Sequence, residues 1–258
     1  MPQEFPLIIA HRGFCKDVPE NTLAAFQKAV KAGANMIELD VRNTSDGHPV
    51  VFHDHTLYRT TAQRGIIEML TLNQVQKLNV GQREAGTSQK FRVPTLEEVL
   101  TFAKDRILLN IELKVAGTEK AVVKLIEKHE MINKVVVSSF RFSSLKRVRE
   151  LQPEVRIGCI AFFLAGFGEI AEKLAPYSVH LWTPLVLSDR PLRRAHQNGI
   201  RVYLWQVNSN AQFRRLTRWG VDGVFTDATD LLVDAVPEKF RRIRLETLPP
   251  PLTPVSEP

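Results

Sequence analysis

Short apolar segments alternate with amphipathic segments along most of the chain. The apolar segments are rich in β-branched residues and nearly continuous, which is typical of strands buried in a parallel sheet. Eight strands are predicted, at Leu7–Ala10, Met36–Val41, Ile107–Glu112, Val135–Ser138, Arg156–Ala161, Ser178–Leu181, Arg201–Gln206 and Val224–Thr226. Helical spacing of apolar residues predicts helices at Thr22–Lys31, Leu96–Phe102, Glu119–Lys128, Phe142–Leu151, Glu169–Leu174, Pro191–Asn198 and Ala211–Trp219.

The regular strand–helix alternation predicts an α/β fold, and its eight units with no long antiparallel run favour a closed (β/α)8 TIM barrel over a doubly wound sheet. The 258 residues match the usual length of one such barrel. We therefore expect one domain over residues 1–244. Asn21 is the expected N-cap of the first helix, because it directly precedes the helical pattern.

Two segments depart from the alternation. A short strand at Val50–Phe52 follows the second barrel strand, and a polar stretch then continues to Pro94. Loops that follow barrel strands lie on the catalytic face, so this insertion, residues 54–93, is expected over the active site. The segment from Leu245 onward is proline-rich, so residues 245–258 are expected to be disordered or to form an extended arm.

Charge and cysteine content narrow the possible partners. The chain carries 35 Lys+Arg against 28 Asp+Glu, a formal charge of +7, but no basic stripe interleaved with aromatic residues. We therefore expect no nucleic-acid partner and a solvated surface excess of charge. Cys15 and Cys159 cannot make a disulfide framework, and no apolar run is long enough for a leader or a membrane span. The expectation is a cytoplasmic protein without stable membrane insertion.

Polar and charged side chains recur where the predicted strands end. The carboxyl ends of barrel strands converge on one mouth, where catalytic residues are found, so these side chains are expected to lie close together. The set comprises His11, Arg12, Glu38, Asp40, Glu112, Lys114, Ser138, Ser139, Trp205, Gln206, Thr226 and Asp227.

Strand alternation places three carboxylates inside the predicted barrel. Glu38 and Asp40 share the face opposite Ile37 and Leu39, and Glu112 follows the same pattern. Pairs of carboxylates a few ångströms apart repel by roughly 4 kcal/mol at an effective dielectric near 20. Protons or a metal must relieve this repulsion, and an all-oxygen set suits Mg²⁺ or Ca²⁺. The alternative is a structural ion network of these acids with Arg12 and Lys114.

Two histidines are candidates for proton transfer. His11 and His53 each follow a predicted strand and have ionisable neighbours. A cation, a base and an acid are the parts that hydrolysis of a phosphodiester needs. The alternatives are that each histidine is a hydrogen-bonded core residue, or that His53 and His55 form a metal-ligand pair.

Eight motifs occur in an order that resembles the glycerophosphodiester phosphodiesterase family, over roughly residues 7 to 235. They are His11-Arg12-Gly13, Pro19-Glu20-Asn21-Thr22, Glu38-Leu39-Asp40-Val41, Val51-Phe52-His53-Asp54, Pro94-Thr95-Leu96, Ile111-Glu112-Leu113-Lys114, Ser138-Ser139-Phe140 and Gly220-Val221-Asp222-Gly223. Two positions depart from the family pattern: Gln206 follows Trp205 where threonine is usual, and Ala228 replaces a proline.

The resemblance implies hydrolysis of glycerophosphocholine, glycerophosphoethanolamine and similar small phosphodiesters to glycerol 3-phosphate and an alcohol. It implies a divalent cation, Mg²⁺ or Ca²⁺, at Glu38, Asp40 and Glu112. His11 and His53 are the implied catalytic pair, and our working hypothesis makes His11 the base and His53 the acid, with the opposite assignment open. The resemblance also implies that the substrate's own 2-hydroxyl attacks phosphorus and forms a cyclic phosphate. Substrate contacts are implied for Arg12, Lys114 and Trp205.

Two other functions are compatible with the same motifs. One is a lysophospholipase D-type enzyme on the same fold, for which an apolar lip formed by Phe162, Phe163, Leu164 and Phe167 would argue. The other is a phosphodiester-binding protein without activity, which is disfavoured because each expected catalytic position is filled.

Overall fold

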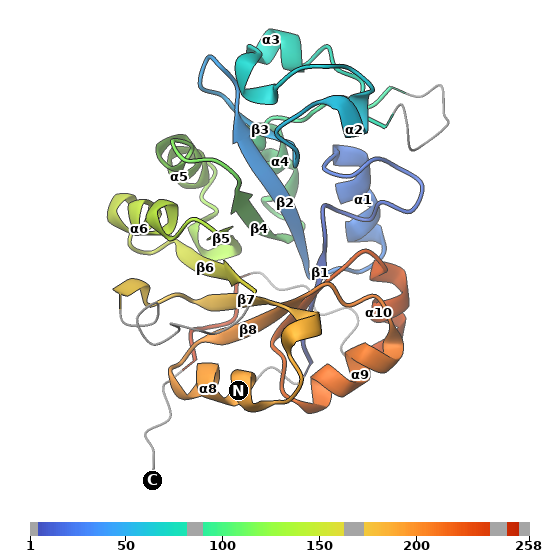
Figure 1. Ribbon diagram of the computed structural model, residues 1–258, viewed down its shortest axis with the longest axis vertical. Helices are drawn as coiled ribbons and strands as arrows, with labels where there is room; N and C mark the ends of the chain where they lie inside the picture. The colour runs from blue at the N-terminus through green and yellow to red at the C-terminus, as the bar shows by residue number, and fades with distance from the viewer. Residues whose placement is uncertain (1–4, 82–89, 163–172, 238–246, 253–258) are drawn as a thin grey trace.

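Nine strands form one sheet in the computed structural model, which describes residues 5–81, 90–162, 173–237 and 247–252. Eight of them are parallel and close into a barrel in the order β1-β9-β8-β7-β6-β5-β4-β2, since β1 also pairs with β2 (Figure 1). The ninth, β3, pairs antiparallel with the end of β2. The strands are β1 Leu7–Ala10, β2 Met36–Asn43, β3 Pro49–Val51, β4 Leu108–Leu113, β5 Val135–Ser139, β6 Arg156–Ala161, β7 Ser178–Trp182, β8 Arg201–Trp205 and β9 Gly223–Thr226.

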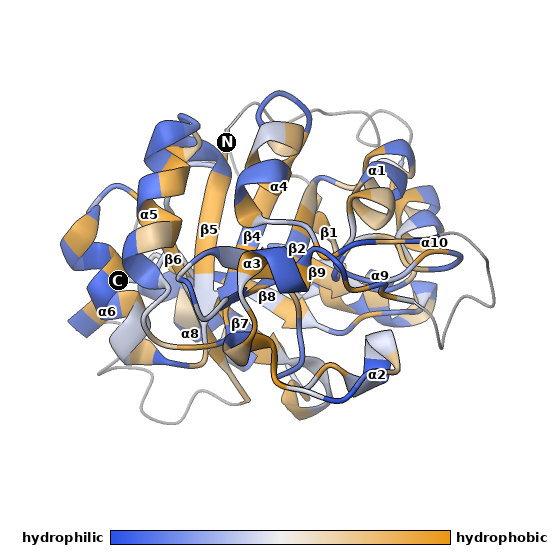
Figure 2. Ribbon diagram, turned by 90° about the horizontal axis from the view of Figure 1, so that it is seen from above, coloured by the Kyte–Doolittle hydropathy of each residue, from blue (hydrophilic) through white to orange (hydrophobic). Residues whose placement is uncertain are grey.

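Helices follow most of the barrel strands and cover their outer faces, so the predicted (β/α)8 TIM barrel is confirmed. In Figure 2, β5 is hydrophobic along most of its length, whereas α4, α5 and α6 show hydrophobic and hydrophilic residues in turn. None of the helices within the described residues is long and apolar enough to cross a membrane. The helices are α1 Leu23–Lys31, α2 Tyr58–Thr61, η1 Ile67–Met69, α3 Leu72–Val75, α4 Leu96–Ala103, α5 Glu119–Lys128, η2 Ile132–Lys134, α6 Phe142–Leu151, η3 Thr183–Leu185, α8 Arg190–Gln197, α9 Asn210–Arg218 and α10 Thr229–Ala235.

Two apolar layers between the strands and the helices hold the barrel together. Ile37, Leu39 and Val41 on β2 belong to the larger cluster, which includes buried residues of α1, α4, α5 and α6. The strands β7 to β9 pack with α8, α9 and α10 in the second cluster. Because these alternate residues face outward, the residues between them on each strand face the barrel axis.

The barrel interior is apolar near the start of the strands and charged near the end of β1, β2 and β4. Leu7, Met36, Leu108 and Tyr203 pack together in the lower part. The register between β2 and β4 sets Glu38 beside Asn110 and Asp40 beside Glu112. An apolar base therefore supports a charged mouth, and that arrangement positions the candidate site.

The insertion after β2 builds a small core of its own. Its apolar side chains are buried together with residues of β3, which the polar composition did not predict. Thr71 and Gln74 form a reciprocal capping box at the start of α3. Figure 1 shows α2 and α3 at one end of the molecule, next to β3. The buried set is Val50, Phe52, Leu57, Ile67, Val75, Leu78, Val80, Phe91 and Val93.

The structure corrects the start of the first helix. Thr22, not Asn21, is the N-cap, and its hydroxyl accepts a hydrogen bond from the amide of Ala25. Asn21 has a φ of 56° and directs its side chain to Asp40 instead. Left-handed backbone is a conformation that asparagine tolerates better than most residues. Most of the helix predicted at Glu169–Leu174 lies outside the described residues.

Residues 247–252 of the proline-rich segment run as an extended arm across the base of the barrel. Leu248 is 2% exposed and packs among the lower barrel residues. Its amide donates to the carbonyl of Asn133. The Pro249 carbonyl accepts from Arg156 and Tyr177, and the Pro250 carbonyl accepts from Arg201.

Shortening Leu248 should destabilise the barrel from its base. Leu248→Ala removes buried methyl groups and leaves a cavity, so we expect a loss of about 2–4 kcal/mol in the free energy of unfolding. Leu187→Ala is a matched control because Leu187 is 84% exposed, and it should change stability by less than about 0.5 kcal/mol. Urea unfolding measures both variants. Equal stability of the two variants would mean that the arm does not contribute to the core in solution.

Candidate active site

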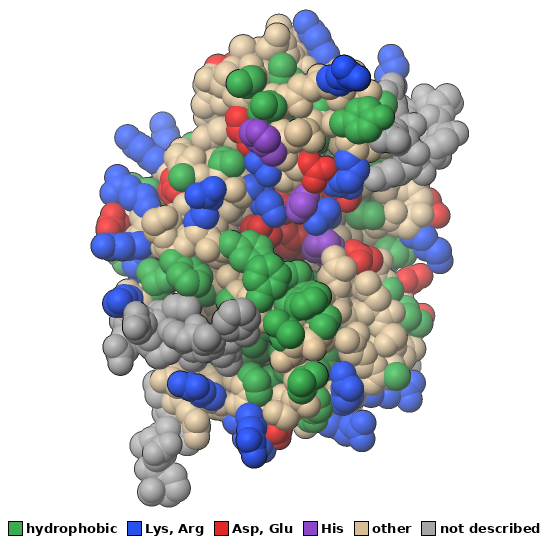
Figure 3. Space-filling model, viewed as in Figure 1, with side chains coloured by type: hydrophobic (Ala, Val, Ile, Leu, Met, Phe, Trp, Pro, Cys, Tyr) green, Lys and Arg blue, Asp and Glu red, His purple; other side chains and the backbone are tan. Residues whose placement is uncertain are grey.

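Seven of the twelve polar strand-end residues predicted from the sequence line a cavity of about 210 Å³ at the barrel mouth. The other five, which do not line it, are Asp40, Ser138, Ser139, Thr226 and Asp227. Figure 3 shows acidic, basic and histidine side chains gathered in a hollow, with a hydrophobic patch directly beside it. The strands β1, β2 and β4 supply the charged side of the cavity, and β5 to β8 supply the aromatic side. The lining residues are His11, Arg12, Glu38, His53, Asn110, Glu112, Lys114, Phe140, Ile160, His180, Trp182, Trp205, Gln206 and Phe225.

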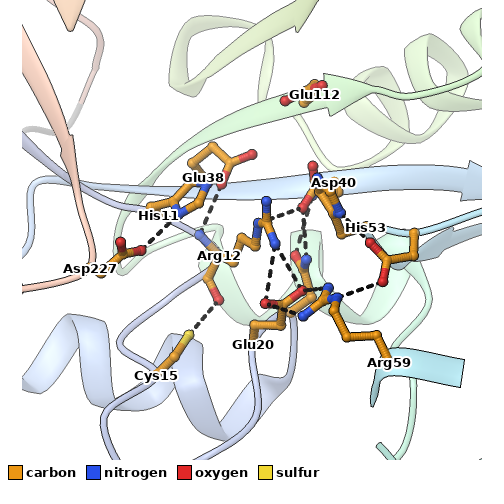
Figure 4. A network of polar contacts seen from close by, with 12 residues as sticks. His11, Arg12, Cys15, Glu20, Glu38, Asp40, His53, Arg59, Glu112 and Asp227 are labelled. Atoms are coloured by element: carbon orange, nitrogen blue, oxygen red, sulfur yellow. Dashed lines mark hydrogen bonds and ion pairs between the residues drawn. The ribbon is translucent and has the colours of Figure 1, made fainter. Parts of the chain in front are cut away.

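The three carboxylates predicted to hold a metal lie together. One carboxylate oxygen from each of Glu38, Asp40 and Glu112 lies within 4.8 Å of the other two. Glu38 and Asp40 are buried, and Glu112 is partly buried. The alternation of β2 and its register with β4 produce this convergence, as the sequence pattern indicated (Figure 4).

The negative charge of Asp40 is balanced by neighbouring groups more fully than that of Glu38 or Glu112. Its carboxylate lies 3.4 Å from the Lys114 ammonium and 3.4 Å from Nε of Arg12. The Asn21 amide donates to it at 2.8 Å. Burial opposes ionisation, but these cations and the hydrogen bond outweigh it and lower the pKa of Asp40 to about 2.

The negative charges of Glu38 and Glu112 are balanced less well than that of Asp40. Burial and the charge of Asp40 raise the pKa of Glu38 to about 8, although the Arg12 amide donates to it at 2.9 Å. The same two causes raise the pKa of Glu112, even with Lys114 at 2.7 Å. An ion network with Arg12 and Lys114 therefore leaves part of the negative charge unbalanced. The oxygen donor set and this residual charge fit a hard divalent cation.

Metal affinity should depend on pH, because Glu38 must lose its proton to act as a ligand. A pKa of about 8 means that its carboxyl is mostly protonated near pH 7 in the metal-free protein. The apparent affinity for Mg²⁺ or Ca²⁺ should rise about tenfold per pH unit below pH 8 and level off above it. Calorimetric titration in buffers of different ionisation enthalpy should detect about one proton released per ion near pH 7. A flat affinity between about pH 6 and 8 would contradict this reasoning.

His11 is held at the mouth by Asp227, which follows β9. Its Nδ1 lies 2.8 Å from the Asp227 carboxylate, and the side-chain amide of Gln206 lies 2.8 Å from the same nitrogen. Burial lowers the pKa of His11, but the hydrogen bond to Asp227 and the charge of Glu38 outweigh it, so the net pKa is raised. The unusual Gln206 therefore contacts a candidate catalytic residue.

His53 has an equivalent carboxylate partner and an opposite pKa direction. Its Nδ1 lies 2.6 Å from Asp54, and Arg59 on α2 donates to the other Asp54 oxygen at 2.6 Å. Burial lowers the pKa of His53 and outweighs the attraction of Asp40. Arg59 also pairs with Glu20, which in turn binds Arg12. The insertion thus contributes an arginine that supports both His53 and Arg12 (Figure 4).

The turn after β1 brings Arg12 to the triad. Arg12 has a φ of 55°, and Gly13 follows with a φ of 91°. A Cβ at Gly13 would lie 2.8 Å from the Cβ of Ala25 on α1, so only glycine fits against the helix. This close approach directs the Arg12 guanidinium towards Asp40 and Glu20.

The structure places Trp205 between the aromatic side of the mouth and the cavity floor. Its indole nitrogen donates to the His180 carbonyl at 3.3 Å. His180 lies on the floor with Asn110, and burial lowers the pKa of the His180 imidazole to about 3. The two floor residues were not among the candidate site residues, because a histidine and an asparagine inside apolar strands are also typical of a hydrogen-bonded core.

Several contacts at the site were not assigned from the sequence. Asp227 was noted as a strand-end residue without a role, and its place after β9 was the signal for it. The sequence motifs also gave no predicted function for Glu20, Asp54 or Arg59. His55 pairs with Glu68 at 2.9 Å, and neither His53 nor His55 belongs to the group of metal-ligating side chains found among the described residues. Burial raises the pKa of the Cys15 thiol, which favours packing over reactivity.

Comparison with known proteins gives a consistent family. The chain matches the model of the "Glycerophosphoryl diester phosphodiesterase family" over residues 11–231. It is 36% identical over 239 residues to a glycerophosphodiester phosphodiesterase of Caldanaerobacter subterraneus subsp. tengcongensis, covering 89% of this chain and 97% of that protein. It is 33% identical over 247 residues to a glycerophosphodiester phosphodiesterase of Bacillus subtilis, covering 87% and 84% of the two chains.

Solved structures agree with the fold. An Oleispira antarctica phosphodiesterase, in complex with the product sn-glycerol-3-phosphate, superposes with a TM-score of 0.82 and 29% identity, covering 90% of this chain and 96% of that one. A glycerophosphodiester phosphodiesterase of Thermotoga maritima gives a TM-score of 0.75 and 30% identity, with 90% and 98% covered.

Proposed function

The chain belongs to the glycerophosphoryl diester phosphodiesterase family, and we propose that it hydrolyses glycerophosphodiesters to glycerol 3-phosphate and an alcohol. The observation that carries this proposal is the arrangement of one cavity. Two histidines, each paired with a carboxylate, lie in the cavity that Glu38 and Glu112 also line. The product complex of the Oleispira antarctica relative supports the same substrate class.

Glu38, Asp40 and Glu112 are the proposed ligands of a divalent cation, Mg²⁺ or Ca²⁺. When bound, such a cation neutralises charge on the phosphoryl oxygens. Arg12 and Lys114 line the same cavity and are the proposed phosphate contacts. Three carboxylates, one divalent cation, these two bases and a monoanionic diester sum to a charge of about zero, so substrate binding also depends on the metal.

The proposed acid and base are His11 and His53, in the reverse of our sequence hypothesis. The raised pKa of His11 favours the protonated form, and the lowered pKa of His53 favours the neutral form. A protonated His11 can donate to the leaving alkoxide, and a neutral His53 can accept the proton of the attacking hydroxyl. Asp227 and Asp54 accept from the Nδ1 positions in this assignment, and the Nε2 atoms are the proposed proton-transfer positions. The side-chain amide nitrogen of Gln206 lies 3.4 Å from Nε2 of His11.

Turnover of glycerophosphoethanolamine and glycerophosphocholine tests the proposal directly. Release of glycerol 3-phosphate, measured by an enzyme-coupled assay, is expected for both substrates in the presence of Mg²⁺ or Ca²⁺. Tight binding of these diesters without turnover would support the alternative of a phosphodiester-binding protein.

The identity of the nucleophile can be tested with a modified substrate. If the glycerol 2-hydroxyl attacks phosphorus, its proximity gives a large advantage over an external nucleophile. A 2-deoxy glycerophosphodiester should then be cleaved at least about 10³-fold more slowly than its parent. Phosphorus NMR should show a transient cyclic phosphate with the parent only. Rates within about a factor of ten, without a cyclic species, would mean that His53 activates water from the start.

A further inference from the structure

Glu20 is shared between two arginines that reach it from different parts of the chain. Arg12 follows β1, whereas Arg59 lies on α2 of the insertion. Arg59 binds Glu20 with two nitrogens, Nη2 to Oε1 at 2.5 Å and Nη1 to Oε2 at 3.1 Å. Arg12 reaches the same two oxygens with Nη1 alone, at 3.1 and 3.2 Å. Figure 4 shows both guanidinium groups in contact with this carboxylate, and the two-point contact is the one made by Arg59.

The burial of this pair makes the division of the Glu20 charge important. The side chains of Glu20 and Arg12 are only 16% and 19% exposed. Attraction between opposite charges is stronger where water is largely excluded, and two-point arginine–carboxylate pairs are stronger than single contacts. A Glu20 carboxylate without Arg59 would therefore pair more tightly with Arg12 and compete with any other anion there.

Arg12 keeps part of its binding capacity in the presence of Arg59. Its Nη1 contacts Glu20, and its Nε lies 3.4 Å from Asp40. Nη2 of Arg12 makes no hydrogen bond to any residue that the structure describes. Arg12 also lines the catalytic cavity, and a guanidinium group with a free nitrogen is suited to a phosphate oxygen.

The same Arg59 guanidinium also holds the partner of His53. Its Nε donates to Oδ2 of Asp54 at 2.6 Å, and Oδ1 of Asp54 lies 2.6 Å from Nδ1 of His53. Arginine presents its donors in a planar fork, so one side chain binds two carboxylates at once. Arg59 thus contacts the carboxylate behind the proposed base and the carboxylate behind the proposed phosphate contact.

Backbone packing holds the insertion against the loop that carries Glu20. The carbonyl of Thr60, next to Arg59, accepts from the amide of Gly81. A Cβ at Gly81 would lie 2.1 Å from Cγ of Pro19, so the two loops touch at a position where only glycine fits. Pro19 directly precedes Glu20. The approach of α2 to Glu20 therefore has support besides the ion pair, and it should persist when Arg59 is replaced.

We propose that Arg59 is a positioning residue with two roles: it neutralises Glu20, so that Arg12 stays available to the substrate phosphate, and it holds Asp54 against His53. This inference rests on the proposed phosphodiesterase function. Arg59 is not among the residues that line the cavity, so it acts through Glu20 and Asp54. The insertion then contributes to binding and to proton transfer through a single side chain.

A double-variant cycle tests the first role. Arg59→Ala should raise KM for glycerophosphoethanolamine about tenfold, because Glu20 then pairs with Arg12 alone and a hydrogen bond to phosphate is weakened. Adding Glu20→Gln removes the competing charge, so the double variant should recover KM to within about threefold of the parent. Glu20→Gln in the parent completes the cycle, and its effect on KM should be smaller there than in the Arg59→Ala background.

Turnover tests the second role in the same proteins. Arg59→Ala should lower kcat by about 10²-fold, because a misplaced His53 ring no longer meets the attacking hydroxyl in the productive geometry. The double variant should keep this low kcat, because Glu20→Gln does nothing for Asp54. Asp54→Asn should lower kcat by a similar factor of about 10² and leave KM within about threefold of the parent. A split between a KM that recovers and a kcat that does not is the signature of the two roles.

The outcomes separate this inference from the proposed function. Arg64→Ala is the matched control, because Arg64 is an exposed arginine of the same insertion, and it should keep the parent kcat and KM. No turnover by the parent would overturn the proposed function itself. With an active parent, unchanged kcat and KM of Arg59→Ala would overturn the positioning role alone. A raised KM that Glu20→Gln does not restore would mean that Arg59 only supports the fold, which also overturns the proposal.

Discussion

Exhaustive chelation should lower turnover of glycerophosphoethanolamine by at least about 10³-fold, and Mg²⁺ or Ca²⁺ should restore it. A divalent cation stabilises developing phosphoryl charge by several kcal/mol, and each 1.4 kcal/mol corresponds to about tenfold in rate. One carboxylate oxygen from each of Glu38, Asp40 and Glu112 lies within 4.8 Å of the other two, so the three oxygens can share one cation. The measurement is the steady-state rate in EDTA, followed by titration with each ion.

A ligand variant locates this requirement in the triad. Glu112→Gln should weaken metal affinity together with the rate, because one charged oxygen donor is lost. Glu97→Gln is the matched control, since Glu97 lies on α4 and pairs with Lys128 away from the mouth. Full activity of the parent after chelation would remove the cation from this site. A normal metal titration and rate of Glu112→Gln would remove only Glu112 from the ligand set.

The triad could be predicted from sequence because strand geometry alone determines it. Side chains on a strand alternate between its two faces, so Ile37 and Leu39 in the outer core require Glu38 and Asp40 to point inward. The parallel pairing of β2 with β4 then sets Glu112 beside Asp40 in a fixed register. The fold could also be predicted from the sequence. The pattern of eight strand–helix units extends along the whole chain, so an error in the bounds of one strand or helix does not change it.

The residues that pair with the candidate catalytic side chains were harder to predict from the sequence, because these contacts depend on the paths of loops. His11 and Asp227 are 216 positions apart and meet only because β1 and β9 are neighbours. Arg59 reaches Glu20 from an insertion whose fold rests on its own small core. Asparagine is a preferred residue at helix N-caps, so the sequence indicated that role for Asn21. Only the backbone conformation shows that its side chain contacts Asp40 instead.

The terminal arm illustrates a different limit of sequence reasoning. Proline-rich composition measures how poorly a segment forms its own secondary structure, and it carries no information about grooves elsewhere in the fold. Leu248 packs among the buried residues of the lower barrel, while arginines of β6 and β8 donate to the carbonyls of Pro249 and Pro250. The arm is ordered by tertiary contacts, which proline tolerates because the carbonyl is the only backbone group it needs to pair.

Alanine in place of either histidine should lower kcat by about 10²–10⁴-fold without loss of fold or metal binding. The physical reason is that His11 and His53 line one cavity and have pKa values shifted in opposite senses. His55→Ala and His196→Ala are the controls, since their rings pair with Glu68 and Asp222 outside the cavity. Both controls should stay within a few-fold of the parent. An equal loss at His55 would favour a histidine-containing metal site.

A substrate with a different leaving group then shows which histidine is the acid and which is the base. A pH–rate profile cannot do this, because exchanging the acid and the base gives the same bell-shaped curve. A p-nitrophenyl ester of glycerol 3-phosphate has a leaving group that needs no protonation. If His11 is the acid, His11→Ala should recover to within about tenfold of the parent on this ester, because the lost step is no longer required. His53→Ala should remain impaired by 10² or more, since the nucleophile still needs a base. Recovery of His53→Ala instead would restore the original sequence hypothesis. It would also mean that bound metal reverses the pKa order of the two histidines.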